Sequence, residues 1–147
     1  MNKVYIYSRE QFCKLQPNKD VCAISVWTPD KDAIDYDVLI PPLDGWKDIL
    51  KVTFNDVTYQ GMSHWILFNH ELAKQIVAFI YKYPNVDFVI HCDAGMSRSV
   101  AIGCYLRDML GYELTLNAWP NDEHRNQLVY STLSHYRWKY ILKKGEK

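Results

Sequence analysis

The spacing of hydrophobic and polar residues predicts short strands that alternate with helices along the chain. Alternating or wholly apolar segments typical of strands occupy residues 4–7, 21–26, 37–40, 49–54 and 88–90. Strands that alternate with helices favour an α/β fold. We expect a central mixed, mostly parallel sheet of about five strands, flanked by helices on both faces.

Residues that begin and end helices support the same organisation. Ser8 and Gln11 have the spacing of a capping box, and Pro17 is expected to end the short helix that they open. Asn69 as an N-cap and Pro84 as a stop bound a second helix. Each of these helices connects two predicted strands.

Two further helices are predicted in the second half of the chain. Apolar residues at helical spacing run from Val100 to Leu110, and Gly111 is expected to end this helix. Residues 121–144 form the last predicted helix, with an interruption near Ser134 and basic residues toward its end.

The composition is that of an ordinary globular protein and narrows the range of partners. The 147 residues are 48% hydrophobic and 23% charged, which suits one domain spanning residues 1–147. The 17 basic residues balance the 17 acidic ones, so the chain lacks the positive excess that binds nucleic acid or a membrane surface. The aromatic content of 14% is interpreted as a bulky core.

The cysteines and histidines indicate the redox environment of the protein and whether it binds a metal. Cys13, Cys22, Cys92 and Cys104 form no CxxC pair and follow no secretory signal, which indicates reduced thiols in the cytoplasm. The histidines elsewhere in the chain lack the spacing of metal ligands, so no metal or cofactor is expected. We also expect a monomer.

The loop between the strand at 88–90 and the helix that follows carries the candidate chemistry. A loop that opens a helix directs backbone N–H groups toward the positive end of the helix dipole, where an anion binds. Cys92 lies in that field, which favours a nucleophilic thiolate, and the planar fork of Arg98 can hold two phosphoryl oxygens. The loop reads His91, Cys92, Asp93, Ala94, Gly95, Met96, Ser97, Arg98 and Ser99.

These residues resemble the H-C-x-x-G-x-x-R-S/T signature of the cysteine-dependent protein phosphatases, closest to the small dual-specificity type, and match it at every fixed position. The resemblance implies that Cys92 attacks phosphorus and that residues 93–98 surround the phosphate. Gly95 allows unusual backbone angles, Ser99 donates a hydrogen bond to the sulfur, and His91 orients the loop from behind.

The resemblance also implies an upstream aspartic acid that protonates the leaving oxygen. Asp56 is the candidate, because it follows the strand at 49–54 in a polar loop; a turn-capping role is the alternative. Glu71 and Asp48 are weaker candidates. Asp93 would oppose a thiolate if it pointed inward, so we expect it to face solvent and meet the flank of the substrate.

Asn126 lies downstream, at a position that resembles an asparagine of bacterial members of this group. It would brace the loop, or else be a solvent-exposed helix residue.

Taken together, these features predict hydrolysis of phosphate monoesters on phosphoproteins, at phosphotyrosine and also at phosphoserine or phosphothreonine. The loop has no lysine between Cys92 and Arg98, which disfavours polyanionic lipids. Two alternatives stay open: a pseudophosphatase that binds phosphopeptides without hydrolysing them, and an RNA 5′-phosphatase that uses the same loop. Sulfur transfer of the rhodanese kind is disfavoured, since it would not require His91, Arg98 and Ser99 together.

Overall fold

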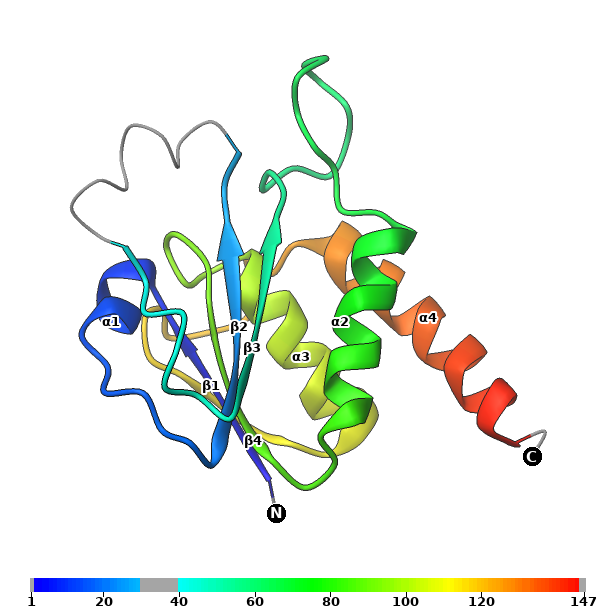
Figure 1. Ribbon diagram of the computed structural model, residues 1–147. Helices are drawn as coiled ribbons and strands as arrows, with labels where there is room; N and C mark the ends of the chain where they lie inside the picture. The colour runs from blue at the N-terminus through cyan, green and yellow to red at the C-terminus, as the bar shows by residue number, and fades with distance from the viewer. Residues whose placement is uncertain (1, 30–39, 146–147) are drawn as a thin grey trace.

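The computed structural model describes residues 2–29 and 40–145, with side chains described as far as Tyr136 (Figure 1). Five strands form one sheet in the order β3-β2-β4-β1-β5. All the strand pairings among the described residues are parallel, which agrees with the expected mostly parallel sheet of about five strands and contains none of the antiparallel pairing that a mixed sheet would add. The strands are β1 (Lys3–Tyr7), β2 (Val21–Trp27), β3 (Asp48–Thr53), β4 (Asp87–His91) and β5 (Glu113–Leu116).

The two faces of the sheet are covered unequally. Alternate strand residues such as Val4, Ile24 and Ile90 are fully buried in the larger core cluster, on the side of α2 (His70–Lys82), α3 (Arg98–Leu110) and α4 (Gln127–Gly145). The residues between them face a smaller cluster that includes Phe12 of α1 (Arg9–Cys13). Figure 1 shows α1 on one side of the sheet and the three longer helices on the other. Helices on both faces are therefore confirmed.

The predicted helix boundaries agree with the structure at most ends. Ser8 and Gln11 form both hydrogen bonds of the capping box. The Asn69 side chain accepts from the Leu72 N–H at the start of α2. Gly111 caps α3 with a left-handed φ of 76°. Local capping rules therefore set these ends correctly.

Four details of the expected fold need comment. The first helix ends at Cys13, before Pro17. The last begins at Gln127, after a turn segment that we had expected to be helical, and it runs through Ser134 without interruption. The short strand β5 was missed, because four half-exposed residues at a sheet edge give little pattern. The strand expected at 37–40 falls outside the described residues except for Ile40.

The parallel arrangement determines where a site can form. All five strands end at the same edge, so the segments that follow β3, β4 and β5 meet there. The loop from β4 to α3 is the candidate loop at 92–97, and the segments after β3 and β5 lie at residues 54–69 and 117–126. No helix in the described part of the chain is long and apolar enough to span a membrane.

Candidate functional site

Cys92 follows the end of β4 and is almost completely buried. Its Sγ lies 3.0 Å from the Oγ of Ser99, in the first turn of α3. Only 2% of the cysteine is exposed. A serine hydroxyl at this distance can donate to a thiolate, which is the contact expected for Ser99.

The backbone of the loop offers unused donors beside this sulfur. In the described part of the chain, no hydrogen bond uses the N–H of Ala94, Gly95, Met96 or Ser97. These amides precede the 13-residue helix α3, whose first turn contains no acidic residue. Consecutive free donors at a helix N-terminus form a site for an anion.

Gly95 has no room for a side chain. Its φ of +71° lies in the left-handed region, and a Cβ at this position would stand 2.7 Å from the backbone N of Ser8. The same Cβ would lie 2.7 Å from the carbonyl carbon of Tyr7 and from the Cβ of Ala118. The loop is therefore seated directly against the end of β1, which only glycine permits.

Arg98 is buried beneath the loop, with 3% of its surface exposed. Its Nη1 donates to the carbonyl oxygens of Phe54 at 2.7 Å and Trp27 at 3.4 Å, where β3 and β2 end. Its Nη2 lies 3.1 Å from the Oδ2 of Asp93. The Nε–H is buried without a partner among the described residues, which leaves a donor on the guanidinium edge that can bind an oxyanion.

We had expected Asp93 to face solvent, but its side chain is turned toward Arg98. Its carboxylate pairs with Arg98 and also accepts a hydrogen bond of 2.6 Å from the Thr28 hydroxyl. Three quarters of the side chain is buried. A buried cation needs a nearby anion. Asp93 therefore balances the charge of Arg98 instead of lying on the protein surface.

His91 lies behind the loop, and both of its ring nitrogens are hydrogen-bonded. Its Nδ1 is 3.2 Å from the Cys92 carbonyl, which can only accept, so Nδ1 carries the proton. Its Nε2 then accepts from the Ser25 hydroxyl at 2.5 Å, and Ser25 accepts from the Trp27 indole at 2.7 Å. Burial lowers the pKa of His91 to about 4, and the neutral ring stacks on Phe12.

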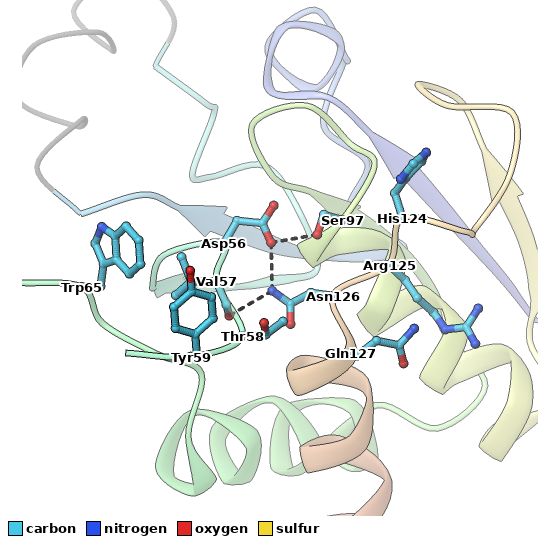
Figure 2. A pocket seen from close by; sticks show the side chains of 10 residues that line it. All are labelled: Asp56, Val57, Thr58, Tyr59, Trp65, Ser97, His124, Arg125, Asn126 and Gln127. Carbon is cyan, nitrogen blue, oxygen red and sulfur yellow. Dashed lines mark hydrogen bonds between the residues drawn. The ribbon is translucent and has the colours of Figure 1, made fainter. Parts of the chain in front are cut away.

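Asp56 reaches the loop from the segment after β3. Its Oδ1 accepts from the Ser97 hydroxyl at 2.7 Å and from the Asn126 amide at 2.8 Å (Figure 2). With Oδ1 so engaged, a proton on this carboxyl group would reside on Oδ2. Asp56 therefore lies beside the loop, where the sequence predicts it.

Asn126 is buried rather than an exposed helix residue. Its side-chain oxygen accepts from the Val129 N–H at 3.1 Å, which caps the start of α4. Its backbone N–H donates to the Ser97 carbonyl at 3.1 Å, while its amide holds Asp56. One residue thus joins the loop, the candidate acid and a helix.

The weaker acid candidates, Asp48 and Glu71, do not join this group of hydrogen bonds in the described part of the chain. Asp48 begins β3, at the opposite edge of the sheet, and accepts from the Tyr83 hydroxyl. Glu71 is exposed in the first turn of α2, with no hydrogen bond to the loop in the described part of the chain. Asp48 is therefore separated from the loop by the length of the strand, and Glu71 makes no contact that would orient it toward the loop among the described residues.

The thiols of Cys13, Cys22 and Cys104 are poor candidates for a nucleophile. Burial raises the pKa of Cys22 and of Cys104 to about 11, and burial also raises the pKa of Cys13. All four cysteines are free. Among the described residues, no three His, Cys, Asp or Glu side chains gather as metal ligands would.

Sequence reasoning missed the groups that hold Arg98 and His91. Backbone carbonyls such as that of Phe54 leave no trace in a sequence. Ser25 could have been found, because it is the one hydroxyl residue within the buried strand β2, and a buried hydroxyl needs a partner. Thr28 lies just beyond the same strand and gave no comparable signal.

The depressed pKa of His91 predicts a pH-dependent stability. The unfolded chain binds a proton near pH 6.5 and the folded chain only near pH 4, so stability falls as the pH drops through this window. The total loss is about 3 kcal/mol. NMR should show the His91 ring neutral, with hydrogen on Nδ1, at pH 5.5. Urea unfolding at a series of pH values should show the free energy of unfolding decrease as the pH falls from about 6.5 to about 4. A ring that titrates between pH 6 and 7 contradicts the burial argument.

Gly95→Ala should destabilise the protein more than Gly111→Ala. Both glycines have positive φ, a conformation that costs an L-residue roughly 1–2 kcal/mol. A Cβ on Gly111 meets nothing within 4 Å, whereas one on Gly95 meets backbone. The difference in urea unfolding free energy between the two variants therefore measures the contact of the loop with β1. Equal losses would show that the loop can move away.

Comparison with known proteins adds a distant resemblance. No protein-family model matches the chain, and no curated protein matches it. Among solved structures, the crystal structure of Tk-PTP in the active form is 18% identical, with a TM-score of 0.46, over 95% of this chain and 80% of that one.

Proposed function

We propose that this protein hydrolyses phosphate monoesters on phosphoproteins, through a phosphocysteine formed on Cys92. The observation that carries the proposal is the meeting of three groups at one loop. Cys92, whose sulfur contacts the Ser99 hydroxyl, belongs to a loop with unused backbone donors. Arg98 of the same loop has an Nε–H without a partner among the described residues, and Ser97 of the loop donates to the carboxyl group of Asp56.

In the first step, the Cys92 thiolate attacks phosphorus and forms an S–P bond while the P–O bond to the leaving group breaks. The loop amides and Arg98 hold the non-bridging oxygens as their charge is redistributed. Asp56 gives its proton to the leaving oxygen, which departs as an alcohol or phenol. Asp56 is then a carboxylate.

In the second step, water attacks the phosphocysteine. Asp56 accepts a proton from this water, the new P–O bond forms and the S–P bond breaks. Inorganic phosphate is released and the sulfur leaves as a thiolate, which the Ser99 hydroxyl stabilises by donating to it. The cycle thus returns Cys92 and Asp56 to their starting states without a metal or cofactor in the scheme.

Phosphoproteins are the favoured substrates within this chemistry, at phosphotyrosine and at phosphoserine or phosphothreonine. The loop offers no lysine to a second phosphate, and the formal net charge of the chain is zero, which disfavours RNA 5′-ends. A binding-only pseudophosphatase is disfavoured because nucleophile, arginine and acid are all brought together. The free thiols suit a reducing, cytoplasmic setting.

Replacing the nucleophile should abolish turnover. Cys92→Ser should reduce phosphate release from an aryl phosphate by about 10⁴-fold or more, because the serine hydroxyl is a far weaker nucleophile at neutral pH. Cys13→Ser, which changes a thiol on α1, is the matched control and should retain activity. The proposal fails if the native chain is inert or if Cys92→Ser retains its rate.

Removing the acid should matter most when the leaving group is poor. Asp56→Asn keeps the shape and the hydrogen bonds but cannot donate the proton, so kcat should fall by about 10²–10³-fold for phenyl phosphate and much less for an activated aryl phosphate. Asp48→Asn, at the opposite sheet edge, should change neither rate. Equal losses on both substrates, or none, would remove Asp56 from the mechanism.

A further inference from the structure

The segment after β3 forms an ordered loop that projects from the sheet edge, over residues 55–66 (Figure 1). Its two ends are tied together: the Asn55 N–H donates to the Ile66 carbonyl at 2.8 Å, and the Ile66 N–H donates to Asn55 Oδ1 at 2.7 Å. Within it, the Gln60 amide donates to the carbonyls of Met62 and Trp65. The 55–66 loop therefore holds a defined shape.

This ordered loop exposes large apolar side chains. Tyr59 is 68% exposed, Met62 50% and Ile66 44%. The rings of Tyr59 and Trp65 meet edge to face, with Gly61 so close that a Cβ there would lie 2.6 Å from the Trp65 ring. Tyrosine, tryptophan and methionine are the residues enriched at protein interfaces, and a pre-formed surface binds at a lower entropic cost.

A pocket of about 360 Å³ connects this loop to the candidate active site (Figure 2). Tyr59 and Trp65 lie on one side of it, and His124, Arg125 and Gln127 lie on the other. The hydrogen bonds that join Asp56 to Ser97 and Asn126 lie between the two sides. The pocket thus begins at the carboxyl group that is proposed to protonate the leaving oxygen.

This placement determines what would enter the pocket. A phosphoryl group bound by the 92–98 loop directs its leaving oxygen to Asp56, and whatever that oxygen carries continues toward the pocket and the 55–66 loop. We propose that the 55–66 loop and this pocket bind the polypeptide that flanks the phosphorylated residue of a phosphoprotein substrate. The inference rests on the proposed function and adds a binding surface to it.

The charges of the loop favour a polypeptide over an RNA strand. The twelve positions 55–66 contain no lysine or arginine and one aspartate, Asp56. Single-stranded nucleic acid requires cations along its backbone in addition to stacking rings. Arg125, the arginine on the other side of the pocket, is paired with Asp122, whose Oδ2 lies 3.3 Å from its Nη1. A loop of aromatic and thioether groups without lysine or arginine matches the side chains and backbone of a peptide.

The test compares two substrates in variants of the exposed loop residues. For Tyr59→Ala and Met62→Ala, kcat/KM is measured for a phosphotyrosine peptide and for a small aryl phosphate, which does not reach the loop. The ratio of peptide to aryl phosphate kcat/KM should fall by about tenfold in Tyr59→Ala. Both side chains are largely exposed, so folding should be unaffected, as circular dichroism can verify.

Leu43→Ala is the matched control, because Leu43 is an exposed apolar residue outside the loop. It should leave the ratio unchanged. An unchanged ratio in Tyr59→Ala and Met62→Ala, in an enzyme that hydrolyses aryl phosphate through Cys92, overturns the inference and leaves the proposed function intact. A loss on 5′-phosphorylated RNA with none on the peptide also overturns it. An inert native enzyme refutes the proposed function first, and the inference with it.

Discussion

The carboxyl edge of this sheet depends on the contacts of one buried guanidinium group, that of Arg98. Arg98 has almost no exposed surface, and a charge in that position is stabilised by nearby hydrogen-bond acceptors and by an anion. The backbone carbonyls at the ends of β2 and β3 accept from its Nη1, and the carboxylate of Asp93 lies beside its Nη2, while its Nε–H has no partner among the described residues. Three strand ends and the first turn of α3 are therefore fixed relative to one another by one side chain.

The candidate acid is positioned by a second set of contacts that starts from this group. Phe54 accepts from Arg98, and two residues later Asp56 receives hydrogen bonds from the loop and from Asn126. Asn126 in turn caps α4, which packs on α2 and α3. Asp56 lies on an exposed segment, yet its position is set by the buried arginine on one side and a helix terminus on the other.

The sequence was sufficient for features that depend on neighbouring residues. The capping box at Ser8, the cap at Asn69 and the loop from His91 to Ser99 follow from local chemistry, and the structure contains them as expected. The prediction that Asp93 faces solvent was wrong, because its ion pair with Arg98 depends on the burial of that arginine, which the sequence does not show. The strand β5 was missed for a similar reason, since its register depends on β1, more than a hundred residues earlier.

The place of β1 in the sheet has a consequence for how the site is assembled. This strand precedes the other four in the sequence, yet both of its partners, β4 and β5, belong to the second half of the chain. Contacts of such large sequence separation close late and slow the search for the native state. Because Gly95 is seated against Tyr7 and Ser8, the 92–98 loop reaches its final shape only when β1 has docked. The geometry of the candidate site is thus coupled to the completion of the sheet, so a chain in which β1 is not yet paired lacks the finished loop.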